Sequence, residues 1–269
     1  MEHKYIILIF TLLIVSLFIN KKKNSNKDKL TVIIPIRDRE RQLKQLLPKL
    51  INLLEYQRFN YNILIIEQSK GKSFNKGKLN NSAFLEAIKL FNPKHILFTD
   101  VDNIPLKKDS YNIDLYNDIM FKHYYGYKNC LGGIFSCSKE TFYKINGFSN
   151  NYWGWGQEDD DLNYRARLMN IQIDRDELLL LNSYKRHERT RQALEMGILD
   201  IEHDGEKVKH NLKSEEQINY NREVYNNRLN KYKKNKYYIF ADGIDQCNYR
   251  IIKKELIPKY KAIRILVDI

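Results

Sequence analysis

Two tryptophans and four consecutive acids lie within one short stretch, NYWGWGQEDDD, at residues 151–161. An indole face can cover the apolar face of a pyranose, and carboxylates accept hydrogen bonds from sugar hydroxyls. One of these carboxylates could also take the proton from an attacking hydroxyl group. The single glycines beside Trp155 disfavour both helix and strand. The stretch therefore predicts a sugar-binding loop that carries a general base.

A purely structural role is the alternative for the acidic run Glu158 to Asp161. Leu162, Ala166 and Met169 mark one face of a helix that would follow it. Acids are favoured at a helix N-terminus by capping and by the helix dipole. Capping needs one or two acids, so the surplus favours the sugar site.

Asp100 and Asp102 lie two residues apart after the apolar segment HILFT. In an extended chain the valine between them turns to the other face, so both carboxylates share one face. Hard oxygen ligands suit Mn²⁺ or Mg²⁺, and either ion can bridge a diphosphate. Such triplets are also common in loops, so the position after a buried strand is what favours a metal site here.

His187, in SYKRHERT, is a candidate third ligand, because imidazole is acceptable to Mn²⁺. The spacing of His187 alone favours the alternative of a surface histidine in a basic segment.

Arg37 and Arg39 follow the first predicted strand. A guanidinium fork matches phosphate oxygens, so these arginines are candidate contacts for a diphosphate or a base, with solvated surface charge as the alternative.

The elements that must position these residues are alternating strands and helices. LTVIIPI, YNILIIEQS and HILFTDVD are typical of buried strands, and residues 38–55 and 76–91 have helical spacing of apolar residues. This order predicts an α/β fold with parallel pairing, helices on both faces and a Rossmann-like nucleotide-binding half. Ligands gather at the carboxyl ends of such strands, where Asp100 and Asp102 lie.

No glycine-rich phosphate motif is present, so a bound nucleotide would need a metal and basic side chains. Residues 186–236 are mostly polar and predict a mobile surface segment followed by a helix. YYIFADGID and AIRILVDI predict two closing strands.

The N-terminus contains an apolar run at residues 5–19 with no small-residue cleavage site after it. It predicts a transmembrane signal anchor, followed by a polar stem at residues 20–29 and one globular catalytic domain at residues 30–269. Five lysines after the run outweigh one before it, and the positive-inside rule then favours a cytosolic body.

The net charge of +13, from 46 basic and 33 acidic residues, could attract nucleic acid, anionic lipid or phosphate-bearing small molecules. The basic residues are scattered except at 21–23 and 231–236, and no nucleic-acid motif accompanies them, so we predict no nucleic-acid partner. Three cysteines exclude a disulfide scaffold, and their spacing is not that of a zinc site.

Several segments resemble, in order, the β-1,4-galactosyltransferase family. They are IIPIRDR, FNKGKLNNSAF, FTDVDNIP, LGGIFSCSKETFYKINGFSNNYWGWGQEDDD, the Arg-His pair at 186–187, and DGID with VDI near the end. The resemblance covers most of residues 30–269, and its central block is highly specific. It implies a GT-A fold, with a mixed sheet flanked by helices, and a single-pass, Golgi-type II membrane protein. It also implies an inverting, Mn²⁺-dependent transfer of a sugar from a UDP-sugar to a glycan 4-hydroxyl, usually of N-acetylglucosamine.

The resemblance further implies individual roles. Asp102 resembles the direct metal ligand, His187 the second protein ligand and Asp159 the proposed catalytic base. Asp160 resembles an acceptor contact. The positions that resemble nucleotide or donor contacts are Arg37, Arg39, Phe74, Lys76, Asp100, Gly133, Trp155 (a mobile tryptophan that closes over the donor) and Glu158.

Three departures from the family pattern bear on specificity. Tyr184 stands where many members have a methionine metal ligand, which predicts an altered metal preference or affinity. Cys130 stands where galactose-specific members have a tyrosine, and its smaller side chain predicts room for the N-acetyl group of UDP-N-acetylgalactosamine. The usual disulfide cysteines have no evident counterparts, which agrees with the lysine distribution rather than with an oxidising lumen.

Two alternatives to this interpretation stay open. One is a related GT-A transferase with another donor or acceptor. The other is a sugar-binding, non-catalytic relative whose metal site Tyr184 has weakened. Metal-dependent UDP binding separates the enzymes from the non-catalytic protein, because the latter has no need of a nucleotide.

Overall fold

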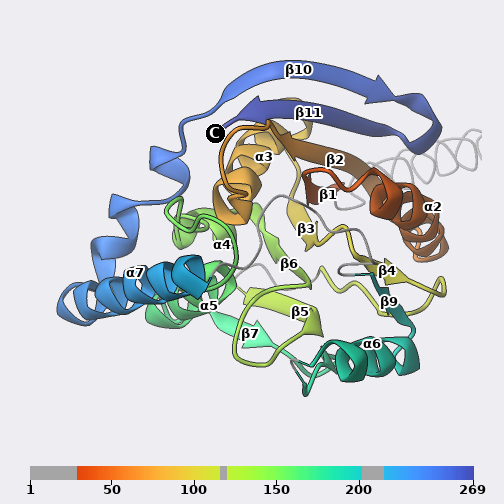
Figure 1. Cartoon of the computed structure of the whole chain (residues 1–269). Coiled ribbons are helices and arrows are strands. Elements are labelled where there is room, and N and C mark those ends of the chain that lie inside the picture. Colours follow the sequence, from red (N-terminus) through yellow and green to blue (C-terminus); the bar gives the residue numbers. More distant parts are fainter. Residues whose placement is uncertain (1–28, 116–119, 184, 202–214) are drawn as a thin grey trace, which may run out of the picture.

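A nine-stranded mixed sheet forms the centre of the computed structural model, which describes residues 29–115, 120–183, 185–201 and 215–269 (Figure 1). The strand order is β10-β11-β2-β1-β3-β6-β5-β7, and β8 pairs with β5. These strands are β1 (Lys29–Ile36), β2 (Asn60–Gln68), β3 (His95–Thr99), β5 (Met120–Gly126), β6 (Ile134–Ser138), β7 (Gln172–Asp174), β8 (Leu179–Leu180), β10 (Arg250–Ile257) and β11 (Ala262–Asp268).

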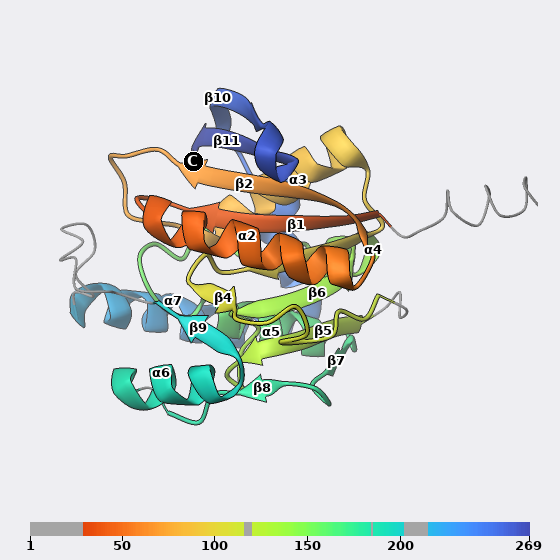
Figure 2. The ribbon, with the colours of Figure 1, turned by 90° about the vertical axis from the view of Figure 1, so that its right-hand side faces the viewer.

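The first half of the sheet is parallel, as the sequence predicts: β1 pairs with β2 and β3, and β11 joins β2. Helices α2 (Glu40–Tyr56) and α3 (Lys76–Phe91) cover its two faces (Figure 2). Val32 packs in the hydrophobic cluster beneath α2, whereas the adjacent Ile33 packs in the cluster beneath α3. Successive side chains of a strand point to opposite faces, so one apolar run fills both cores.

The second half departs from a simple Rossmann pattern because β6 is antiparallel to both β3 and β5. Its helices are α4 (Lys139–Lys144) and α5 (Glu158–Leu168). A separate two-stranded sheet joins β4 (Asn103–Pro105) to β9 (Ile198–Asp200). Helices α6 (Arg186–Glu195) and α7 (Glu215–Lys234) lie in residues 186–236, for which the sequence predicted a surface segment followed by a helix.

The predicted strand YYIFADGID is wrong. This segment forms two 3-10 helices, η1 (Lys236–Ala241) and η2 (Ile244–Gln246). The side chain of Asn235 accepts a hydrogen bond from the backbone N–H of Tyr237 and so begins η1. Asp242 turns inward, where its carboxylate accepts hydrogen bonds from Ser149 and Asn150. These side-chain hydrogen bonds, one local and two long-range, replace the ladder of a strand.

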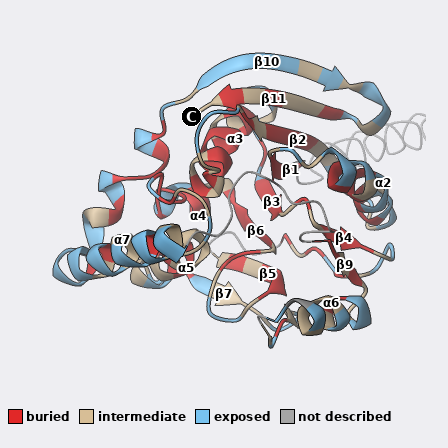
Figure 3. Ribbon diagram, viewed as in Figure 1, coloured by how far each residue is buried: buried red, intermediate tan, exposed pale blue. Residues whose placement is uncertain are grey.

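The C-terminal end of the chain forms the antiparallel pair β10–β11, with η3 (Pro258–Tyr260) between the two strands. AIRILVDI is therefore a strand, as predicted. Exposed residues line β10 and the outer faces of α6 and α7, whereas the central strands are buried (Figure 3).

The predicted anchor at residues 5–19, and the stem up to residue 28, lie outside the described residues. Among those that the structure does describe, no helix is both long and apolar enough to cross a membrane.

Candidate active site

Three elements meet at the carboxyl end of β3. Lys76 begins α3, Asp100 follows β3, and Glu158 and Asp159 open α5. The Lys76 Nζ atom lies 3.2 Å from Asp100 Oδ2, 2.9 Å from Asp159 Oδ2 and 3.8 Å from Glu158 Oε1. Four predicted site residues, distant in sequence, thus form one charged cluster where an α/β sheet places its ligands.

Burial and like charges control the protonation of this cluster. Burial alone would lower the pKa of Lys76, but Asp100, Asp159 and Glu158 raise it well above its usual value, so the ammonium group stays charged. Burial raises the pKa of Asp159 well above the ordinary range, while Lys76 opposes that shift. Within the described part of the chain, Asp159 Oδ1 is buried and has no hydrogen-bond partner. This oxygen is available to accept a proton.

A glycine pair lets the backbone approach Asp159 closely. A Cβ atom at Gly132 would lie only 2.3 Å from Asp159 Oδ2, and one at Gly133 would lie 2.3 Å from the Tyr125 carbonyl oxygen. Gly133 also has φ +75°, a conformation that favours glycine, and its carbonyl accepts a hydrogen bond from Asp100 N at 3.1 Å. Gly132 is therefore a site residue that the sequence did not single out, although it adjoins the predicted Gly133.

Nearby charged residues influence the protonation of Asp102. Burial, then Asp100 and Asp200, raise the pKa of Asp102 to about 6, and Arg39 opposes them. The Asp102 carbonyl accepts a hydrogen bond from Ile201 N at 3.0 Å, which ties it to β9. Asp200 was missed in the sequence because it lies far along the chain in a polar segment. The pairing of β4 with β9 brings it here.

Among the described residues, nothing brings His187 into contact with Asp102. The His187 side chain is 82% exposed in the first turn of α6, and its Nε2 atom lies 3.7 Å from Glu188 Oε1. Tyr184 lies outside the described residues. Among the side chains that are described, no group of three or more His, Cys, Asp or Glu is assembled around a common metal position.

The predicted nucleotide side is formed by Arg37 and Phe74. The Arg37 guanidinium lies over the Phe74 ring, 5.3 Å from its centroid, and donates a hydrogen bond to the Lys72 carbonyl at 2.6 Å. The Phe74 carbonyl accepts a hydrogen bond from Gly154 N at 2.6 Å. The nucleotide side and the tryptophan loop are thus joined through one backbone contact.

The two indoles of the tryptophan loop, residues 153–156, lie in different environments. Trp153 packs against the core, whereas Trp155 is 45% exposed. Gly154 and Gly156 have φ +80° and +100°, which explains why glycines stand there. Only Trp155 is therefore placed to cover a ligand.

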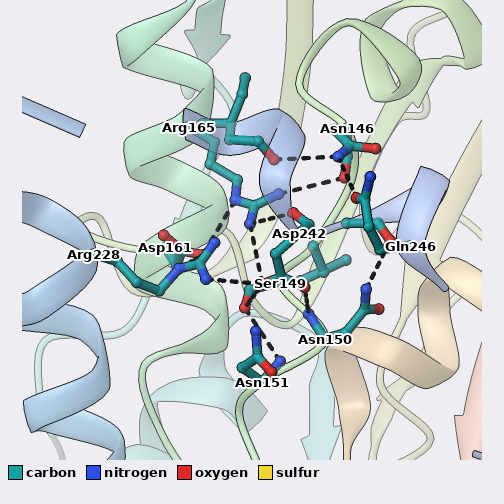
Figure 4. Close-up of polar contacts among 12 residues, drawn as sticks. Asn146, Ser149, Asn150, Asn151, Asp161, Arg165, Arg228, Asp242 and Gln246 are labelled. Atoms are coloured by element: carbon teal, nitrogen blue, oxygen red, sulfur yellow. Dashed lines mark hydrogen bonds and ion pairs between the residues drawn. The ribbon is translucent and has the colours of Figure 1, made fainter. Parts of the chain in front are cut away.

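The four acids at residues 158–161 also differ in their environments. Asp161 is fully buried and pairs with Arg165 at 3.2 Å and with Arg228 at 3.5 Å (Figure 4). It is structural, so the sugar-site interpretation does not extend to all four acids. Asp160 is half-buried, and burial followed by the charge of Glu158 raises its pKa.

Cys130 lies beside the acidic turn. Burial, then Asp159 and Asp160, raise the pKa of its thiol to about 12, so the side chain is neutral. All three cysteines are free. The predicted specificity residue is therefore close to the predicted base, and the backbone N–H of the next residue, Leu131, donates to the Asp159 carbonyl at 3.0 Å.

Two family models match this chain. The N-terminal region of glycosyl transferase group 7 matches residues 18–114, and the family described as the N-terminal domain of galactosyltransferase matches residues 119–190. Together they cover more than half of the chain. The chain belongs to the β-1,4-galactosyltransferase family.

Curated β-1,4-galactosyltransferases and a related enzyme match about half of this chain. Human β-1,4-galactosyltransferase 4 is 38% identical over 156 residues, which are 55% of this chain and 45% of the relative. A β-N-acetyl-D-glucosaminide β-1,4-N-acetylglucosaminyltransferase of Lymnaea stagnalis is 39% identical over 154 residues, 54% of this chain and 31% of the relative. The chain thus matches less than half the length of these relatives.

Solved structures show that the galactosyltransferase fold extends over nearly the whole chain. The catalytic domain of Drosophila β-1,4-galactosyltransferase 7 with xylobiose gives a TM-score of 0.66 at 23% identity, over 90% of this chain and 94% of that one. A mutant of the same enzyme, in complex with manganese, UDP-galactose and xylobiose, gives 0.64 at 22% identity with the same coverage.

Proposed function

We propose that this chain is an inverting, metal-dependent hexosyltransferase that moves galactose or N-acetylgalactosamine from a UDP-sugar to a glycan hydroxyl, the 4-hydroxyl of N-acetylglucosamine. The observation that carries the proposal is Asp159. Its Oδ2 is held by Lys76 at 2.9 Å, and its Oδ1 is buried without a hydrogen-bond partner among the described residues. A carboxylate with one fixed and one open oxygen suits a general base.

In the proposed reaction the acceptor oxygen attacks the anomeric carbon of the donor sugar. The new carbon–oxygen bond forms as the bond to the diphosphate oxygen breaks, and UDP leaves with the electron pair. Asp159 accepts the acceptor proton, Glu158 binds the donor sugar and Asp160 binds the acceptor. Lys76 keeps Asp159 oriented, and Trp155 covers the donor to exclude water.

Mn²⁺ is the proposed cofactor, with Asp102 and His187 as its protein ligands; the family relationship alone supports His187, whose side chain is exposed in the structure. The feature that fits a cation is the negative charge of Asp100 and Asp200 near Asp102, which together with burial raises the pKa of Asp102 to about 6. Carboxylate oxygens suit both Mn²⁺ and Mg²⁺, whereas an imidazole ligand favours Mn²⁺ over Mg²⁺. The bound ion would supply positive charge to the diphosphate of the leaving group. The Drosophila relative that binds manganese and UDP-galactose supports this assignment.

Arg37, Arg39 and Phe74 form the proposed nucleotide pocket. The Phe74 ring is already stacked beneath the Arg37 guanidinium, so a planar cation and an aromatic face are prepared for a uracil base and a phosphate.

We further propose membrane attachment through the segment at residues 5–19, in a Golgi-type II arrangement. This proposal rests on the family relationship alone.

A panel of UDP-sugars tests the function. The purified chain is incubated with Mn²⁺, each donor and free N-acetylglucosamine, and UDP release is measured. We expect release from UDP-galactose or UDP-N-acetylgalactosamine that needs the acceptor and is abolished by EDTA. UDP binding without turnover would indicate another acceptor. The absence of any metal-dependent UDP binding would contradict the proposal and favour a non-catalytic sugar-binding relative.

The donor preference is the subject of a second prediction, at Cys130. A cysteine beside Asp159 and Asp160 leaves more room than a tyrosine, and the Lymnaea relative that transfers N-acetylglucosamine supports N-acetyl donors in this family. We expect Cys130→Tyr to lower the ratio of kcat/KM for UDP-N-acetylgalactosamine over UDP-galactose roughly tenfold or more. Cys137→Ala, at a buried cysteine elsewhere, is the matched control and should leave the ratio unchanged. A wild-type enzyme that strongly prefers UDP-galactose would contradict the prediction.

A further inference from the structure

Helix α7 contacts the tryptophan loop through one fully buried asparagine. Asn221 is 0% exposed, and its Nδ2 atom donates hydrogen bonds to the carbonyl oxygens of Trp153 at 3.0 Å and of Trp155 at 3.1 Å. A single amide group therefore holds the loop backbone on both sides of Gly154. Such buried hydrogen bonds are costly to break, because the carbonyls lose their partner away from water.

One turn earlier on the same helix, Gln217 packs against Gly154. A Cβ atom at Gly154 would lie 2.3 Å from the Gln217 Cδ atom, so the helix and the loop are in close contact. On its other side the loop is held by the hydrogen bond from Gly154 N to the Phe74 carbonyl. The loop is thus fixed between α7 and the proposed nucleotide pocket.

The position of α7 is itself fixed to the helix that carries the proposed base. Arg228, two turns after Asn221, pairs with Asp161 of α5 at 3.5 Å and with Asp242 at 2.8 Å. Tyr232 stacks on Tyr164 of α5, with ring centroids 5.8 Å apart. Helix α7 therefore contacts both α5 and the tryptophan loop.

We propose that Asn221 is a positioning residue for donor binding, which fixes the loop so that the Trp155 indole is presented to the UDP-sugar. The proposal rests on the proposed function above. By donating to the carbonyls of both Trp153 and Trp155, Asn221 limits the positions that the backbone on either side of Gly154 can adopt.

The two tryptophans of the chain, Trp153 and Trp155, both lie in this loop, so intrinsic tryptophan fluorescence reports on the loop alone. The test compares Asn221→Asp, Asn221→Ala and the wild-type chain by acrylamide quenching, UDP titration and steady-state kinetics. The aspartate is the same size but, once ionised, cannot donate to the two carbonyls. Asn226→Ala, at an exposed position of the same helix, is the matched control.

We expect both Asn221 variants to show stronger quenching in the free protein. Their donor KM should rise roughly tenfold, while kcat changes less, because the loss falls on donor binding. Asn226→Ala should match the wild type in every measurement. If Asn221 variants fail to fold, Gln217→Ala, which removes the contact at Gly154 together with the 3.4 Å hydrogen bond to Ser73 Oγ, should give the same direction of change.

Unchanged quenching and unchanged donor KM in a folded Asn221 variant would overturn the proposal. A uniform fall in kcat with unaltered quenching would do so as well, because it would indicate a merely structural role. Since quenching is measured without substrate, the positioning role of Asn221 is tested even when the wild-type chain transfers no sugar, and failure of the proposed function is then recognised separately.

Discussion

Asp159→Asn is expected to reduce the transfer rate about 10²- to 10⁴-fold, the usual contribution of a positioned general base. The amide has the size of the carboxylate but cannot accept the acceptor proton. Lys76 would still contact the oxygen of the new side chain, so the local structure should persist. The measurement is UDP release under saturating donor and acceptor, with UDP affinity measured in parallel. UDP affinity should change little, because the assigned nucleotide contacts are elsewhere.

The pH dependence provides a second readout for Asp159. A base acts only when ionised, and burial raises the pKa of Asp159 well above its ordinary range. Activity should therefore fall as the pH decreases through this raised pKa, at a higher pH than an exposed aspartate would give. Asp160→Asn, which alters the adjacent acid, should keep this acidic limb. A rate for Asp159→Asn close to that of the wild type would contradict the assignment of the base.

The parallel half of the fold could be predicted because its strands are buried on both faces. β1 and β2 are continuous apolar runs, and α3 begins and ends where the spacing indicates. The segment at 237–245 could not be predicted from hydropathy. There the conformation depends on Asp242, whose carboxylate contacts residues about ninety positions earlier in the chain. The residue pattern within 237–245 does not indicate these long-range contacts.

The candidate site likewise contains some residues that could be placed from the sequence and others that could not. Lys76, Asp100 and Asp159 could be placed together because each lies at the end of a recognisable element. Asp200 and Asn221 could not, since they lie in polar segments and reach the site only through tertiary packing. The role of Asp161 also depends on tertiary contacts: nothing in EDDD distinguishes this buried acid from Glu158 and Asp159, which contact Lys76.

Arg165 is a fully buried charge that supports the site. Its side chain is 0% exposed, and it donates hydrogen bonds to Asp161 at 3.2 Å, to the Gly147 carbonyl at 3.0 Å and to the Asp242 carbonyl at 2.9 Å (Figure 4). It thereby joins α5 to the loop after α4 and to the segment after η1. Burial alone would raise the pKa of Asp242, but Arg228 and Arg165 lower it below its usual range.

Arg165→Met is expected to lower the free energy of unfolding by about 3–5 kcal/mol, the typical cost of removing one partner of a buried ion pair. Methionine fills a similar volume, so the loss reports mainly the carboxylate and the carbonyls left unpaired. The measurement is urea unfolding, with Arg167→Met, an exposed arginine of the same helix, as the control that should change little.

The pH dependence of that difference follows from Asp242. A carboxylate with a lowered folded-state pKa stabilises the fold above its unfolded-state pKa and loses that contribution as the pH falls through the folded-state value. The difference between wild type and Arg165→Met should therefore shrink in acid. A variant as stable as Arg167→Met at neutral pH would show that Arg228 alone neutralises Asp161 and Asp242, and that the three-element junction does not depend on Arg165.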